Sequence, residues 1–293
     1  MEIRRILVPL DGSQLAEAAL PAAASIAQTL RARLMLLHVL ERDAPEQVHG
    51  EAHLTRAAEA RRYLRDHADR LRAEGVDVDS DVHERPVTDV AAALDVHAHE
   101  LDADLIAMCA HGRTNLLDRP LGTIAEQILR GGSIPILLRT VRRLQQSEFR
   151  LTNLLVGIDF AHDVDAALDA ARTFARPFGA KITLLTAREP AAAAASRLLP
   201  SASALAREFE QADAVRRLDE LVERLRSESF DANALVMEQQ PSDAIAAASG
   251  ALPADLIVLV SDVHGGLASW YDPSTVQRLL GEPDLTFLLI KEL

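Results

Sequence analysis

The sequence predicts an α/β protein in which β-strands alternate with helices and form parallel sheets. Short aliphatic runs with no polar face indicate strands that are buried on both sides. Longer stretches between these runs place Ala, Leu and charged residues at helical spacing. The same order of runs then returns in the second half of the chain. Alternation of strand and helix implies right-handed crossovers and a doubly wound sheet.

The first half contains one set of these elements. Aliphatic runs lie at residues 4–10, 33–39, 104–108 and 134–138, and helical patterns lie at residues 14–30, 52–73, 87–100 and 122–130. The first run ends at Asp11 and Gly12, which signal a turn before a helix. Residues 76–82 alternate Val with Asp, which is typical of a sheet edge with one solvated face. Pro135 lies at the start of the last run, where a missing N–H donor is tolerated.

The second half repeats the first. Residues 153–159 echo residues 5–11, so that Asp159 lies 148 positions after Asp11. The echo continues at residues 181–186, 203–227, 254–260 and 286–290. A fixed order of elements that returns in this way indicates two copies of one domain. We therefore predict domains at residues 1–145 and 151–293. Each is flavodoxin- or Rossmann-like, with a five-stranded parallel sheet and helices on both faces.

Composition excludes several classes of protein. Of the 293 residues, 48% are hydrophobic and 26% are charged, as in a globular protein with a water-exposed surface. Aromatic residues make up only 3%, so the cores are predicted to be aliphatic. A net charge of −13 argues against a nucleic-acid partner. No apolar run is long enough to cross a membrane, and no signal peptide is expected, which favours the cytoplasm.

The candidate site lies where the winding of the first sheet reverses. In such sheets ligands bind beyond the carboxyl ends of the strands. Asp11 follows the first strand, Val39 closes the second, and residues 111–123 form a loop between the fourth strand and a helix. Backbone N–H groups and a helix N-terminus attract anions such as phosphate. The sequence therefore predicts a nucleotide site, with a carboxylate for ribose hydroxyls or a metal ion.

This loop is similar to the loop of one known family. Gly112 is followed by nine residues and then by Gly122 and Thr123, which matches the spacing in nucleotide-binding members of the universal stress protein family. Cys109 replaces the leading glycine of that motif. The family also has an aspartate after the first strand, here Asp11, and a backbone contact to adenine at the end of the second, here Val39. The resemblance covers nearly the whole chain as two copies, so we identify a tandem member.

The resemblance implies a function and a set of binding residues. It implies adenine nucleotide alpha hydrolase-like domains, with ATP bound in the first copy and Mg²⁺ held at Asp11. The protein would then act as a nucleotide-dependent module in stress response or signalling. It also implies a homodimer, and the last strands at residues 136–141 and 287–292 would pair within the chain as a pseudo-dimer. A partner protein is expected but not identified. The candidate nucleotide-binding residues are Pro9, Leu10, Asp11, Val39, Met108, Cys109, His111, Gly112, Arg113, Gly122, Thr123 and Ile124.

The second copy departs from the motif. Asp159 is present, but Asp262 stands three positions before Gly265, where the leading glycine would be. The later glycine is missing, and Trp270 and Tyr271 occupy the loop. A carboxylate near the phosphates would repel them. The second copy is therefore predicted to bind nucleotide poorly or not at all.

Several simpler interpretations stay open. Asp11 is either a ligand or the N-cap of the next helix, and the loop glycines are either binding or ordinary turn residues. Cys109 is a redox thiol or, as we favour, a small buried residue. His97 is expected to be an exposed helix histidine. Because the sequence has no Walker A or nucleophile-elbow motif, a weak ATPase and a non-nucleotide interaction protein with decayed sites are the alternative functions.

Overall fold

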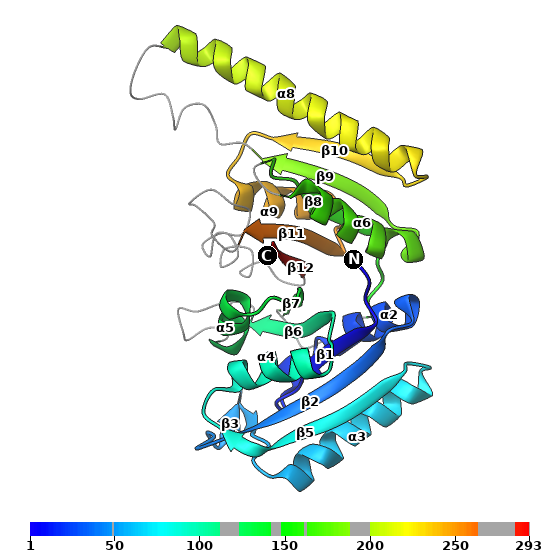
Figure 1. Ribbon diagram of the computed structural model, residues 1–293, viewed down its shortest axis with the longest axis vertical. Helices are drawn as coiled ribbons and strands as arrows, with labels where there is room; N and C mark the ends of the chain where they lie inside the picture. The colour runs from blue at the N-terminus through cyan, green and yellow to red at the C-terminus, as the bar shows by residue number, and fades with distance from the viewer. Residues whose placement is uncertain are drawn as a thin grey trace. The chain divides into compact units, whose positions relative to one another are not determined.

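The computed structural model describes residues 1–48, 50–111, 123–141, 148–160, 163–187, 200–262 and 285–292 (Figure 1). The chain forms two compact units. The N-terminal unit contains Glu2–Arg150 together with the C-terminal strand, and the other unit starts at Leu151. No helix in the part of the chain that the structure describes is long and apolar enough to cross a membrane.

The N-terminal unit contains five parallel strands and five helices among its described residues. The strand order is β7-β6-β1-β2-β5, so the first strand is central and the edge strand is β5. The strands are β1 (Arg5–Pro9), β2 (Arg33–Glu41), β5 (Val78–Val87), β6 (Leu105–His111) and β7 (Ile136–Val141). The helices are α1 (Gln14–Glu17), α2 (Leu20–Leu30), α3 (Ala57–Ala73), α4 (Val90–Glu100) and α5 (Thr123–Gly131). A small hairpin is formed by β3 (Gln47–Val48) and β4 (Glu51–Ala52).

The last strand of the chain, β12 (Thr286–Glu292), is antiparallel to β7, with Phe287 opposite Leu138. This confirms the predicted pairing of the two last strands. The Lys291 ammonium also donates to the Gly132 carbonyl, 2.7 Å away, just past the C-terminus of α5. A cation is favourable there because the helix dipole leaves that end partly negative.

The C-terminal unit repeats the same plan with four parallel strands in the order β10-β9-β8-β11. In Figure 1, α8 runs alongside β10 as α3 runs alongside β5. Its elements are β8 (Asn153–Gly157), α6 (Val164–Phe178), β9 (Lys181–Ala187), α8 (Pro200–Ser227), β10 (Ala232–Met237), α9 (Pro241–Ala251) and β11 (Leu256–Asp262). The predicted class of two α/β domains with parallel sheets is confirmed. The fifth strand of the second copy, β12, pairs with the first copy's β7.

Three predicted helices differ from the sequence pattern, because one splits in two and two begin later. The first splits into α1 and α2, because Pro21 lacks the N–H that a continuous helix would require and starts a new first turn instead. The long helix starts at Ala57, since Ala52 belongs to the hairpin strand β4. The third starts at Val90, because β5 continues to Val87 and Asp89 then caps the helix by accepting from the Ala92 N–H.

The core is aliphatic, as the composition predicts. Ile6, Leu7 and Val8 of the central strand are fully buried on both faces of the sheet. Each such side chain contributes about 1.5–3 kcal/mol when it leaves water. The stripe on α3 follows helical spacing, with Ala60, Leu64, His67, Ala68 and Leu71 buried.

Candidate functional site

The turn after β1 is held by a short chain of hydrogen bonds. Asp11 Oδ1 accepts from the Ser13 N–H at 2.9 Å and from the Ser13 hydroxyl at 2.6 Å. Ser13 Oγ then accepts from the Ala16 N–H at 3.2 Å and is the N-cap of α1. The alternative in which Asp11 itself caps the helix is therefore wrong. Asp11 instead orients the residue that does so, and its carboxylate stays at the carboxyl end of the central strand.

Gly12 must be a glycine for two reasons. Its φ of +95° lies in the left-handed region, which residues with a Cβ rarely adopt. A Cβ at this position would also lie 2.7 Å from Leu54 Cγ. The side chain of Leu54, just before α3, thus covers the turn that follows Asp11.

The end of β6 lies beside this turn. Cys109 is paired in register with Arg139 of β7. Burial raises the pKa of the Cys109 thiol to about 12, the charge of Arg139 opposes this, and the charge of Asp11 adds to it. Asp11 and Cys109 therefore lie close enough to interact, as predicted for the sheet edge. The high pKa keeps the thiol protonated, which favours the interpretation of Cys109 as a small structural residue over a redox thiol.

The remaining predicted residues fall on either side of the loop. Pro9 ends β1, and the Leu10 N–H still donates to the Leu37 carbonyl at 2.9 Å. Met108 is buried on β6 and Ile124 is exposed in the first turn of α5. His111 is the last residue of β6 and Thr123 the first of α5, whereas Gly112, Arg113 and Gly122 lie outside the described residues.

The sequence predicts that Val39 closes the second strand, but in the structure this strand ends later. β2 continues for two more residues to Glu41, because β5 is long enough to pair with this extension. The register shifts between Val39 and Glu41, so Val39 lies next to an irregularity of the ladder. Val39 itself is buried.

The register of the strands also corrects one comparison between the copies. β1 and β8 pair with their neighbours in the same way, so Leu105 on β6 is equivalent to Leu256 on β11. Counting along both strands places Val260, not Asp262, at the position of Cys109. A count back from Gly265 gives Asp262 instead, because Gly265 lies five positions after Val260, whereas Gly112 lies three positions after Cys109.

Two buried polar residues near this edge were missed by the sequence reasoning. His38 is 1% exposed, and its two ring nitrogens contact the carbonyls of Leu10 and Leu54. Arg139 is 8% exposed and, with Thr140, is one of two buried polar residues on β7. A polar residue inside an aliphatic run, as for His38, or directly after one, as for Arg139, is the signal that could have found both, since such residues are rarely buried without a partner.

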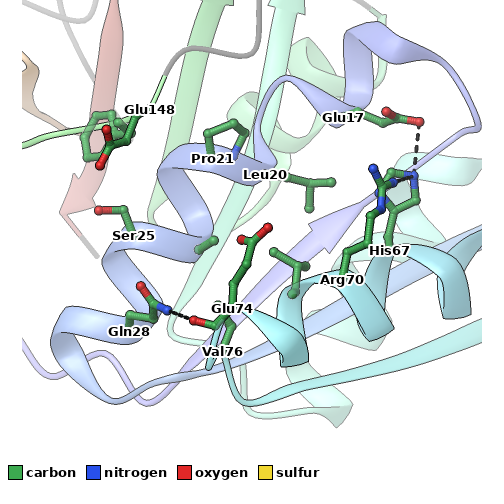
Figure 2. Close-up of a pocket in the computed structure, with 13 residues that line it drawn as sticks. Glu17, Leu20, Pro21, Ser25, Gln28, His67, Arg70, Glu74, Val76 and Glu148 are labelled. Carbon is green, nitrogen blue, oxygen red and sulfur yellow. Dashed lines mark hydrogen bonds and ion pairs between the residues drawn. The ribbon is translucent and has the colours of Figure 1, made fainter.

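A groove of about 470 Å³ lies beside α2 and α3 (Figure 2). At one end, Tyr63 OH donates to Glu17 Oε1 at 3.1 Å, and His67 Nε2 contacts the same oxygen at 3.1 Å. Arg70 in turn donates to His67 Nδ1 at 2.8 Å. Burial pulls the pKa of Glu17 upward, but the hydrogen bonds from His67 and Tyr63 outweigh it, so this pKa lies below its usual value. The network ties α1, which directly follows the Asp11 turn, to α3.

Comparisons with known proteins agree with the repeat. The model of the universal stress protein family matches residues 2–139 and again residues 151–291. A universal stress protein from Archaeoglobus fulgidus superposes with a TM-score of 0.77 at 16% identity, covering 99% of both chains. A functionally unknown protein from Pseudomonas aeruginosa PAO1 gives 0.65 at 17%, covering 99% of this chain and 92% of that one.

A second protein from Pseudomonas aeruginosa, a putative universal stress protein from strain UCBPP-PA14, gives a TM-score of 0.65 at 18% identity. It covers 99% of this chain and 93% of its own. At these identities the likeness concerns the fold. No curated protein matches the sequence significantly.

Proposed function

Because the chain belongs to the universal stress protein family, with one domain in each half, we propose that its N-terminal unit binds ATP with Mg²⁺. The protein would act as a nucleotide-dependent stress-response module. One observation supports this more than any other. The central strand β1 lies between β2 and β6, so Asp11, Val39 and Cys109 share the carboxyl edge of one sheet. That edge is where open α/β sheets bind ligands.

The charges at this edge suit a nucleotide with its metal ion. Mg²⁺ is usually held by one or two carboxylates together with phosphates, not by a complete protein cage. Among the described residues no three His, Cys, Asp or Glu side chains gather as a metal site, so the ion would arrive with the nucleotide and meet Asp11. The bonds to Ser13 orient that carboxylate in advance. A protonated Cys109 adds no negative charge beside the phosphates.

Cys109 also fits its position without strain. A cysteine would be costly where the backbone requires a positive φ. Cys109 lies instead in strand β6, where it pairs with Arg139, and it is not among the non-glycine residues with positive φ. Replacement of the family's leading glycine is therefore compatible with a working site. The start of α5 at Thr123, with the partly positive end of a helix, supports phosphate binding by the loop.

Equilibrium dialysis of the full chain with MgATP tests the proposal. We expect one site per chain. We also expect Asp11→Asn to weaken binding about ten- to a hundredfold, because it removes a charge while an amide oxygen can still accept from Ser13. The matched variant Asp159→Asn in the second copy should leave binding unchanged. Equal effects of the two variants would contradict a site confined to the first copy. No binding by the wild-type chain would contradict the proposal and favour an interaction protein with decayed sites.

A further inference from the structure

His38 makes two contacts that a neutral imidazole does not satisfy together. Its ring is 1% exposed and lies next to Val39, at the carboxyl edge of the sheet. Nδ1 is 2.7 Å from the Leu10 carbonyl oxygen, and Nε2 is 3.0 Å from the Leu54 carbonyl oxygen. Both partners are backbone carbonyls, which accept hydrogen bonds but never donate them.

The protonation state of the ring follows from these partners. A neutral imidazole has one N–H and one lone pair, so one of its nitrogens would face a carbonyl oxygen lone pair to lone pair. An imidazolium donates at both nitrogens, and a separation of 2.7 Å is typical of a charge-assisted hydrogen bond. A buried polar atom without a hydrogen bond is costly. The observed geometry therefore matches the doubly protonated ring.

The two carbonyls belong to opposite sides of the candidate site. Leu10 directly precedes Asp11, and the side chain of Leu54 covers Gly12. The ring thus joins the end of β1 to the segment that closes over the turn. Glu51, three residues before Leu54, holds the other side of the turn by accepting from the Gln14 N–H at 2.6 Å.

One further titratable ring lies close to that of His38. The ring of His53 lies edge-on to that of His38, with centroids 6.4 Å apart. On β5 the register partner is the apolar Val82. Titratable groups on the elements packed against β2 include His67 on α3, Asp81 and His83 on the opposite face of β5, and His97 on α4, which contacts His83.

We infer that His38 is a positioning residue whose imidazolium form clamps Leu54 over the turn that follows Asp11. On loss of the proton, the shorter contact to Leu10 keeps the remaining N–H and the contact to Leu54 is released. Because the clamp needs a proton on both ring nitrogens, its opening can be followed as the pH is raised. Its effect on nucleotide binding rests on the proposed function, whereas the clamp itself does not.

The ring can be observed directly in the full chain. Long-range ¹H–¹⁵N spectra, with the His38 signals assigned from a His38→Thr variant, should show both nitrogens protonated at pH 6. Amide exchange near Leu54 should accelerate when one nitrogen loses its proton. Threonine is chosen because Thr186 occupies the equivalent place on β9.

His99 is the matched control. Its Nδ1 contacts the Asp95 carbonyl and its Nε2 contacts the Ser133 hydroxyl, so a neutral ring satisfies both contacts. A His38 ring with one bare nitrogen throughout pH 5.5–8.5 (roughly the range in which imidazole titrates) would overturn the inference.

A second measurement links the clamp to the site. Between about pH 6 and pH 8, the affinity for MgATP should fall about threefold more in the wild type than in His38→Gln. A threefold change corresponds to the loss of about one hydrogen bond. The comparison with the variant removes the titration of the nucleotide itself. Equal pH profiles would overturn the positioning role. Absence of MgATP binding at every pH would contradict the proposed function, and the ring spectra would still decide the clamp.

Discussion

The two units share one scaffold at the amino ends of their strands and differ at the carboxyl ends. In the N-terminal unit, Asp104 Oδ2 accepts from the N–H groups of Arg4 and Arg5 at 2.7 and 2.9 Å. In the C-terminal unit, Asp255 Oδ2 accepts from those of Thr152 and Asn153 at 2.8 and 2.9 Å. An aspartate before the fourth strand thus holds the start of the first strand in both copies.

At the carboxyl ends the correspondence stops. The N-cap of α1 is Ser13, two residues after Asp11, whereas the N-cap of α6 is Asp163, four residues after Asp159. The buried His38 of β2 is replaced on β9 by the buried Thr186. The difference teaches that the repeat preserves the sheet, while the residues at the carboxyl ends of the strands differ between the two copies.

The largest expected effect is on stability, and it distinguishes the turn at Gly12 from the turn at Gly179. Gly12→Ala should destabilise the protein by about 2–4 kcal/mol, because the alanine adds the cost of a positive φ to an overlap with Leu54. Gly179→Ala at the end of α6 is the control, with a φ of +64° and nothing within 4 Å of the added Cβ. It should cost only about 1–2 kcal/mol. Urea unfolding measures both, and equal losses would show that Leu54 yields freely.

The next effect tests the shared scaffold. Asp104→Ala and Asp255→Ala each remove the acceptor of two backbone N–H groups and should each cost about 1.5–3 kcal/mol. Each variant should shift the unfolding of its own unit, which amide hydrogen exchange resolves by residue. A large loss of stability in one variant and none in the other would show that the two aspartates are not equivalent.

The smallest expected effect concerns the hydrogen bonds that Glu17 and Glu228 make to neighbouring helices. Glu17→Gln weakens the link from α1 to α3, and Glu228→Gln removes the paired bonds to Arg172 of α6, at 2.7 and 2.8 Å. Each should cost about 0.5–1.5 kcal/mol at neutral pH. Both pKa values are lowered by folding, Glu17 as described above and Glu228 chiefly by its hydrogen bond from Arg172.

A lowered pKa sets the sign of the pH dependence. Each carboxylate contributes its stability above the unfolded pKa near 4.5 and loses it as the pH falls through the lower, folded value. The wild-type advantage over each variant should therefore disappear in acid below that pH. Thermal unfolding across acid and neutral pH measures this, and an advantage that persisted in acid would assign the effect to packing.

The alternation of aliphatic runs and helical stretches was sufficient to predict both α/β units. Local periodicity and the handedness of crossovers leave few other topologies. The repeat was readable because the same residue types recur in the same order at nearly equal offsets, 148 positions for Asp11 and Asp159 and 151 for Asp104 and Asp255. The family's loop spacing pointed to the carboxyl edge, where the structure places Asp11 and Cys109 together. Pairing of β12 with β7 followed from the family resemblance, not from periodicity.

Only the tertiary structure decided which polar groups meet. His97, expected to be an exposed helix histidine, is half-buried, and its Nε2 is 2.7 Å from Nδ1 of His83 on β5. His38 finds its carbonyls 28 and 16 residues away in the chain. Periodicity records which face of an element is buried, but a hydrogen bond depends on ångström distances between elements remote in sequence. The sequence by itself therefore determined the scaffold and the edge, and tertiary packing determined how the edge is held.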